Sequence, residues 1–180
     1  ANAESREDVT EAHALGAAGV GLYRTEFLFL GSSVLPDEEA QFRAYRDAVL
    51  AMTGRTVTIR TLDLGADKAD KTGLALRDEP NPALGLRGVR LSLVRQELLR
   101  TQLRAIARAS GYGPVRVLVP MVSGGEELRA VRRMLDEVLR ELRAQGLETA
   151  PQLPLGTMIE VPAAALALGT FVGQCDFQIG

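Results

Sequence analysis

The stretch that decides the fold is Val57–Lys68, VTIRTLDLGADK. It begins with an apolar, β-branched run that is typical of a buried strand, and this run stops at Arg60. Four polar residues follow within the same stretch: Thr61, Asp63, Asp67 and Lys68. A buried arginine is costly unless it holds an anion, so the stretch predicts a strand that ends in a ligand-binding site.

The composition indicates a folded domain and excludes several classes of protein. The chain has 180 residues, of which 46% are hydrophobic, as in one globular domain. One cysteine, Cys175, and one histidine, His13, supply neither an internal disulfide nor a zinc cluster. No apolar run reaches the roughly 18 residues of a membrane span, and no signal-like pattern opens the chain. We expect a cytoplasmic protein without membrane insertion.

The charges argue against nucleic acid as a partner. Lys and Arg number 21 against 23 Asp and Glu, and the two signs are interspersed, as in Glu126–Arg143. Aromatic residues make up 4% of the chain, which is too few for a base-stacking surface. The sequence therefore predicts neither a basic stripe nor a stacking platform.

Strand and helix patterns alternate along the chain. Apolar runs that predict strands lie at 20–23, 57–60, 115–122, 153–161 and 176–180. Helical patterns lie at 3–18, from 36 to 54, at 95–109, 124–145 and 163–172. We expect Gly19 to end the first helix and Ser123 to cap the fourth. The alternation favours a parallel sheet with right-handed crossovers.

Unusual polar residues follow the predicted strands. Arg24, Arg60 and Glu160 each stand at a strand end, and Arg87 lies in a long, Gly- and Pro-containing loop from 63 to about 90. A site built at the carboxyl ends of strands is the arrangement of a (β/α) barrel. A doubly wound open sheet is the alternative, although no G-x-G-x-x-G follows a strand.

These residues suit a small, highly anionic substrate. Arginine binds phosphate and carboxylate oxygens through two parallel hydrogen bonds, and a nearby acid such as Glu160 can hold Mg²⁺. Phosphoryl transfer depends mainly on positioning and on charge neutralisation, which such a set would provide. The alternative for each residue is an ordinary ion pair at the mouth of a loop.

Five segments resemble successive motifs of one known family. They are GAAGVGLYRTEFLFL (16–30), VTIRTLDLGADK (57–68), NPALGLRGVRLSL (81–93), VLVPMVSGGEEL (117–128) and LGTMIEVPAAA (155–165). In this order and spacing they are similar to the phosphoenolpyruvate-binding domain of enzyme I, the phosphoenolpyruvate–protein phosphotransferase of the bacterial sugar phosphotransferase system. The likeness covers essentially the whole chain.

The resemblance implies a fold, an activity and roles for four residues. In this family a (β/α)8 barrel binds phosphoenolpyruvate and Mg²⁺, and the phosphoryl group passes to a histidine on a separate domain and then to the carrier protein HPr. Arg24 and Arg60 would be catalytic and substrate-binding, Arg87 substrate-binding, and Glu160 a magnesium ligand. Pyruvate phosphate dikinase and phosphoenolpyruvate synthase share the barrel and remain alternatives, as does a non-catalytic module for a phosphorylated ligand.

The chain also departs from the family pattern. It corresponds to about five of eight barrel strands, the second to the sixth, so residues 1–180 form a partial domain. A further metal ligand, another arginine and a catalytic cysteine are expected after Gly180, and neither Cys175 nor His13 matches a catalytic position. We expect a fragment of a longer protein, inactive alone, that forms a homo-oligomer through its open sheet edges.

Overall fold

The sheet is built from parallel strands in chain order. The computed structural model describes residues 1–30, 34–64, 85–166, 168–171 and 173–180. It has a six-stranded sheet with the order β1-β2-β3-β4-β5-β6, and every neighbouring pair is parallel. The strands are β1 (Asn2–Ala3), β2 (Val20–Tyr23), β3 (Val57–Arg60), β4 (Val115–Val119), β5 (Leu155–Met158) and β6 (Phe177–Ile179).

This topology confirms the predicted α/β class and the parallel sheet. All five predicted strand runs contain a strand, and β1 adds a sixth at Asn2–Ala3, so the expectation of about five strands was one short. A doubly wound sheet reverses its strand order at a switch point. The six described strands show no reversal, which argues against that alternative.

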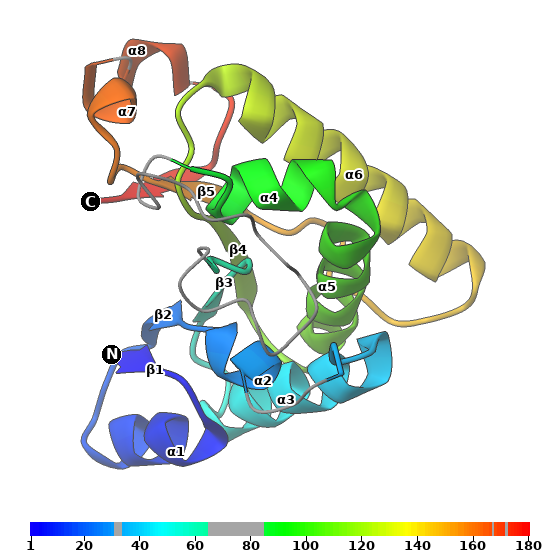
Figure 1. Ribbon diagram of the computed structural model, residues 1–180. Coiled ribbons are helices and arrows are strands. Elements are labelled where there is room, and N and C mark those ends of the chain that lie inside the picture. The colour runs from blue at the N-terminus through cyan, green and yellow to red at the C-terminus, as the bar shows by residue number, and fades with distance from the viewer. Residues whose placement is uncertain (31–33, 65–84, 167, 172) are drawn as a thin grey trace.

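Helices follow most strands and lie along one side of the sheet (Figure 1). They are α1 (Arg6–Ala14), α2 (Glu26–Leu30), α3 (Glu38–Ala51), α4 (Gly88–Val94), α5 (Gln96–Ala109), a 3-10 turn η1 (Ser110–Tyr112), α6 (Gly125–Ala144), α7 (Pro162–Leu166) and α8 (Leu168–Phe171). The strands follow an arc, and both termini lie at its open side. The result is a curled half-barrel with helices outside it.

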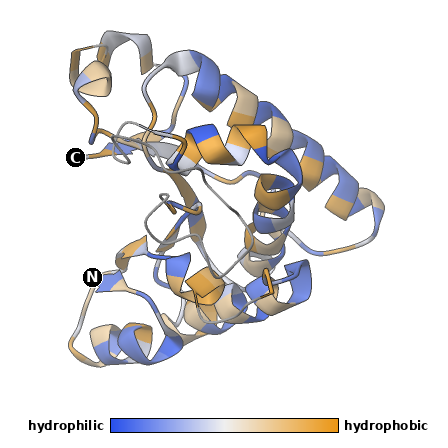
Figure 2. Ribbon diagram, viewed as in Figure 1, coloured by the Kyte–Doolittle hydropathy of each residue, from blue (hydrophilic) through white to orange (hydrophobic). Residues whose placement is uncertain are grey.

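The core lies between the curled sheet and the longer helices. Strand residues such as Val57, Ile59 and Val117 are fully buried against apolar residues of α3, α5 and α6. α5 packs against both α3 and α6, and Figure 2 shows polar residues on the outward side of α6. None of the helices described here is long and apolar enough to cross a bilayer.

Several element boundaries differ from the sequence prediction for local reasons. The first helix begins after Ser5, whose side chain accepts a hydrogen bond from Asp8 N, and it ends earlier than expected, before Gly16. Gly16 has a φ of 82°, a left-handed conformation that suits glycine at a helix end, so Gly19 is not the terminator. The first helix is therefore shorter than predicted, whereas α5 and α6 match their predicted ranges to within one residue at each end.

The cap of α6 was also predicted wrongly. Gly124, not Ser123, is the N-cap residue. The carboxylate of Glu127 instead accepts hydrogen bonds from the backbone N–H groups of both residues, at 2.7 Å from Ser123 and 3.2 Å from Gly124. An acid in the first turn can satisfy these otherwise free donors and complement the helix dipole.

Candidate functional site

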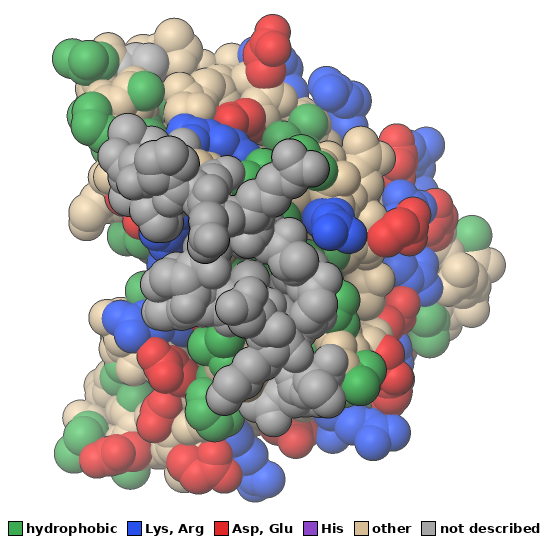
Figure 3. Space-filling model, viewed as in Figure 1, with side chains coloured by type: hydrophobic (Ala, Val, Ile, Leu, Met, Phe, Trp, Pro, Cys, Tyr) green, Lys and Arg blue, Asp and Glu red, His purple; other side chains and the backbone are tan. Residues whose placement is uncertain are grey.

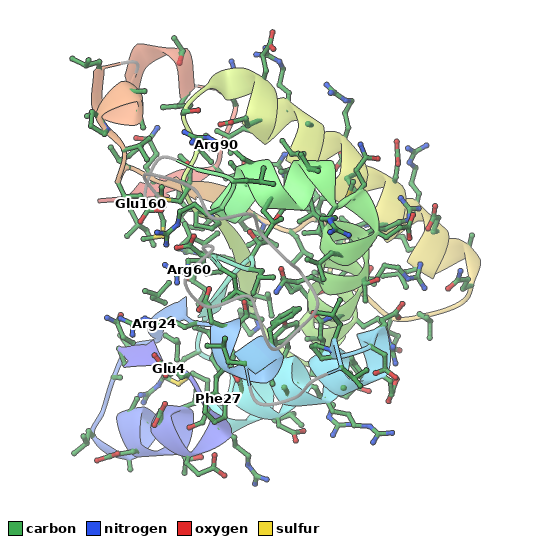
Figure 4. The ribbon with its side chains drawn as sticks, viewed as in Figure 1. Glu4, Arg24, Phe27, Arg60, Arg90 and Glu160 are labelled. Carbon is green, nitrogen blue, oxygen red and sulfur yellow. The ribbon has the colours of Figure 1, made fainter. Side chains whose placement is uncertain are left out.

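A pocket of about 390 Å³ lies at the carboxyl ends of the first three strands. Its lining contains three arginines, three acidic residues and two apolar residues. They are Arg24, Arg60 and Arg87, then Glu4, Glu26 and Asp63, and finally Phe27 and Leu30. Figure 4 shows Arg60 between Arg24 and Glu160 in this view. The fold thus brings the three arginines singled out from the sequence into one pocket.

Arg60 ends β3 and is largely buried, with 12% of its side chain exposed. Its guanidinium lies 3.2 Å from Glu26 Oε1 and 3.9 Å from Asp63 Oδ2, and it donates a long hydrogen bond to the Met158 sulfur at 3.7 Å. Its buried Nε–H has no hydrogen-bond partner among the described residues. A buried donor without an acceptor is unfavourable, so the described residues leave part of the hydrogen-bonding capacity of Arg60 unused.

Arg87 reaches the pocket from the start of α4, where it is the N-cap residue. Its Nε and Nη2 donate to the two oxygens of Asp63, both at 3.1 Å, which is the bidentate arrangement that arginine favours. The next residue, Gly88, has a φ of 54°, and a Cβ built there would lie 2.7 Å from Met121 Cβ. Glycine at 88 therefore allows α4 to start against the end of β4.

Arg24 follows β2 and is more exposed than the other two arginines. Its Nη1 lies 2.8 Å from Glu4 Oε1, and the two side chains are 46% and 47% exposed. Exposed ion pairs of this kind contribute little and rearrange readily. Arg24 is therefore the pocket arginine that can change partner at least cost.

Glu160 stands at the same end of the sheet but does not line this pocket. It is exposed, and its Oε1 accepts a 2.7 Å hydrogen bond from Met121 N. Met121 has a φ of 59°, which is unusual for a residue other than glycine. The structure thus gathers Arg24, Arg60 and Arg87, and it places Glu160 beyond them.

The described residues contain no group of three acidic, histidine or cysteine side chains that could hold a metal ion. Glu26 and Asp63 are already paired with buried or partly buried arginines, which leaves Glu4 and Glu160 as the exposed acids described at these strand ends. A divalent cation needs more oxygen ligands than one side chain supplies. These residues alone do not make a magnesium site.

The sequence interpretation missed the acidic half of the pocket. Glu4, Glu26 and Asp63 pair with Arg24, Arg60 and Arg87, so the lining holds three carboxylates with its three arginines. One signal was available, because Glu26 and Asp63 stand two and three residues after pocket arginines. Asp67, Lys68 and the part of the 81–90 stretch before Gly85 lie outside the described residues.

The structure is thus a curled parallel α/β sheet with three arginines gathered in one pocket beyond its strand ends, a position at which α/β proteins commonly place their sites. The family of the phosphoenolpyruvate-binding domain of phosphoenolpyruvate-utilising enzymes matches residues 1–180, and the chain belongs to this family. The resemblance found in the five sequence motifs is confirmed.

Curated relatives extend the match. The chain is 48% identical over 179 residues to a phosphoenolpyruvate-protein phosphotransferase of Cupriavidus necator. It is 45% identical over 177 residues to the protein of that name in Geobacillus stearothermophilus and 44% identical over 177 residues to that in Listeria monocytogenes. Each alignment covers 98% of this chain, and the chain spans only 30% or 31% of each relative.

Proposed function

We propose that the pocket binds phosphoenolpyruvate and that the protein uses it for phosphoryl transfer. The observation that carries this proposal is the meeting of Arg24, Arg60 and Arg87, from three separate segments, in one pocket of about 390 Å³. Phosphoenolpyruvate carries a carboxylate and a phosphate, both of which suit the arginine fork. Family membership and the name shared by the relatives support the same substrate.

The arginines would act by holding and neutralising the substrate. Arg60 has one buried donor without a partner among the described residues, and Arg24 can exchange the exposed Glu4 carboxylate for a ligand oxygen. Arg87 is held by both oxygens of Asp63, so its position is set before the ligand arrives. Fixed cations of this kind stabilise negative charge on the transferring phosphoryl group without reorganising during the reaction.

Mg²⁺ is the proposed cofactor, with Glu160 as one of its ligands. When bound, the ion would neutralise charge on the substrate oxygens. Glu160 is exposed, and one of its oxygens is used by Met121 N. The further oxygen ligands would come from the substrate or from residues other than those described here.

The wider role follows from the family and remains part of the proposal. We infer a (β/α)8 barrel of which residues 1–180 form a part, a histidine acceptor on a separate domain, and onward transfer to HPr in sugar uptake in the cytoplasm.

Homo-oligomerisation is likewise a prediction. Size-exclusion chromatography with light scattering tests it, and a monomer that melts cooperatively at low concentration would contradict it.

Calorimetry with phosphoenolpyruvate tests the proposed function. The protein at its natural length should bind the ligand, more tightly with Mg²⁺, and Arg60→Ala should weaken binding by at least about 100-fold because a buried charge partner is lost. Arg129→Ala is a control, since this exposed arginine lies on α6 outside the pocket. Equal binding by the parent and Arg60→Ala would show that the site is wrongly assigned.

A non-catalytic module for a phosphorylated ligand is the second candidate. The observation in its favour is that the described residues offer no metal-binding cluster. The two candidates differ in one result, because a catalytic protein converts phosphoenolpyruvate to pyruvate when the acceptor is present. Binding without any pyruvate formation would favour the module.

A further inference from the structure

The strand ends that carry Arg24 and Arg60 are joined by a buried glutamine that the sequence did not single out. Gln102 lies in α5, with 1% of its surface exposed, on the same side as the apolar residues Leu99, Leu103 and Ile106. Its side-chain oxygen accepts from Leu62 N at 2.9 Å, and its nitrogen donates to Thr25 Oγ1 at 3.2 Å and Tyr45 Oη at 3.0 Å. A buried amide with every group paired has one orientation.

In this hydrogen-bond network each hydroxyl group accepts one hydrogen bond and donates another. Thr25 accepts from Gln102 and donates its own hydroxyl proton to the Arg60 carbonyl at 3.0 Å. Tyr45 also accepts from Gln102, and it donates to Gln41 Oε1 at 3.1 Å. Burial raises the pKa of the Tyr45 hydroxyl, so it stays protonated and can donate.

These side-chain hydrogen bonds connect β2 and β3 beyond the point where the backbone pairing of the two strands ends. Their register shifts between Val20 and Tyr23, and the last paired residues are Tyr23 and Ile59. The next residues on the two strands are Arg24 and Arg60. Past the last pair, Thr25 binds the Arg60 carbonyl and Gln102 binds Leu62 N, so the two hydrogen bonds flank Thr61.

We propose that Gln102 is a positioning residue, which sets the spacing of Arg24 and Arg60 by fixing the backbone on which both stand. This inference rests on the proposed function. It means that the affinity of the pocket for phosphoenolpyruvate depends on a residue that lies outside the pocket. Gln102 does not line the pocket, so its effect on a ligand has to pass through the two strand ends. Small displacements of positioning groups have large effects on binding and catalysis.

Two near-isosteric variants test the proposal on the protein at its natural length, by calorimetry with phosphoenolpyruvate. Gln102→Met removes the amide, and Thr25→Val removes the hydroxyl that holds the Arg60 carbonyl. Each variant is expected to bind phosphoenolpyruvate about tenfold more weakly, because it loses hydrogen bonding that holds the strand ends in place. Ser110→Ala is the control, because Ser110 is also buried but its hydroxyl binds the Ala107 carbonyl and Ala150 N, away from both strand ends.

A double variant separates positioning from general destabilisation. If Gln102 acts through Arg60, adding Gln102→Met to Arg60→Ala should weaken binding by less than about twofold further, whereas independent effects would multiply. Ser110→Ala should lower the melting temperature and leave the affinity within about twofold of the parent.

The outcomes distinguish the two proposals. Parent-like affinity in both Gln102→Met and Thr25→Val, with Arg60→Ala weakened, would overturn the positioning role and leave the proposed function standing. Multiplying effects in the double variant would overturn the positioning role too. Failure of the parent to bind phosphoenolpyruvate would overturn the proposed function, and the inference with it. If Gln102→Met does not fold, Thr25→Val decides the matter by itself.

Discussion

Two groups of arginines in this protein pair with carboxylates in different ways. Arg100, Arg104 and Arg108 are four residues apart on α5 and bridge to acids on α3 and α6. We call them the outer arginines, and Figure 3 shows acidic and basic side chains interspersed along the edge of the molecule where α3, α5 and α6 lie. The pocket arginines are Arg24, Arg60 and Arg87 at the strand ends.

The outer arginines all pair with acids on neighbouring helices. Arg104 uses Nε, Nη1 and Nη2 to bind Glu38, Glu141 and Gln145. Arg108 binds Glu38 and Glu39, and its guanidinium lies 3.9 Å from the centre of the Phe42 ring. Each outer arginine links neighbouring helices, which is a structural task.

The pocket arginines differ in what they leave open. Within the part of the chain that the structure describes, the buried Nε–H of Arg60 has no partner, and Arg24 forms an exposed ion pair with its acid. They come from separate segments and converge on a hollow, whereas the outer arginines share one helix face. Both groups form ion pairs, so an ion pair alone does not indicate a ligand site. Among the described residues, the pocket group is set apart by its convergence from separate segments and by one buried donor without a partner.

The largest difference in ligand affinity is expected between Arg87→Met and Arg108→Met. Arg87→Met should weaken phosphoenolpyruvate binding by about 100-fold, because a pocket cation is lost and Asp63 is left facing the ligand. Arg108→Met should lower the melting temperature and leave the affinity unchanged. Calorimetry and thermal melts of both variants check this, and a weakened affinity in Arg108→Met would remove the distinction between the two groups.

A smaller effect is expected from Gly88→Ala. The added Cβ would meet Met121 at 2.7 Å and would strain a φ of 54°, so we expect a loss of about 2 kcal/mol in the free energy of unfolding. Affinity should fall as well, because Arg87 stands immediately before Gly88. Denaturant unfolding and calorimetry measure the two quantities.

Gly146→Ala is the matched control for that variant. Gly146 has a φ of 76°, but nothing lies within 4 Å of a Cβ built there, and it follows α6. It should lose stability through backbone strain and retain full affinity. Parent-like affinity in Gly88→Ala would show that the start of α4 does not position Arg87.

Arg104→Ala should lower the free energy of unfolding by about 1 kcal/mol, as expected for the loss of partly exposed ion pairs. Because such pairs are screened, the difference from the parent should shrink in high salt. Urea unfolding at low and high NaCl concentration measures it. A loss that is unaffected by salt would mean that packing of the side chain, and not its charge, supports the helices.

The smallest expected effect concerns acid. Hydrogen bonding from Arg108 lowers the pKa of Glu39 below its ordinary value of 4.5. A carboxyl whose pKa is lowered in the folded state stabilises the protein above the unfolded pKa, and this contribution disappears as pH falls through the folded pKa. Melting temperatures of Glu39→Gln and the parent should therefore differ near pH 6, and the difference should shrink as the pH falls below 4.5 and through the lowered pKa of Glu39. A constant difference across this range would contradict the assignment.

The sequence was sufficient for the features that depend on local pattern. Apolar runs gave the five main strands, and alternation with helices gave the parallel order, because both follow from periodicity and crossover handedness. Arg24 and Arg60 could be expected to meet, since parallel neighbouring strands end at the same edge. The arrival of Arg87 in the same pocket was also expected from its loop.

The remaining features depend on contacts that are distant along the chain. Gln102 lies 77 residues from Thr25, and its pairing could not be read from either position. A polar residue at helical spacing from Leu99 and Ile106 was the available signal. The short helices α2 and α4 were missed, because five to seven residues carry too little periodicity to distinguish a helix from an apolar loop.

The rise in melting temperature caused by saturating phosphoenolpyruvate and Mg²⁺ tests the central claim most directly, in Arg60→Lys and Arg104→Lys side by side. Both variants keep a positive charge, but lysine lacks the two-pronged donor geometry of arginine. We predict that Arg104→Lys shows the same ligand-induced rise as the parent and that Arg60→Lys shows most of it lost. Equal rises in the two variants would contradict the assignment of Arg60 to the ligand.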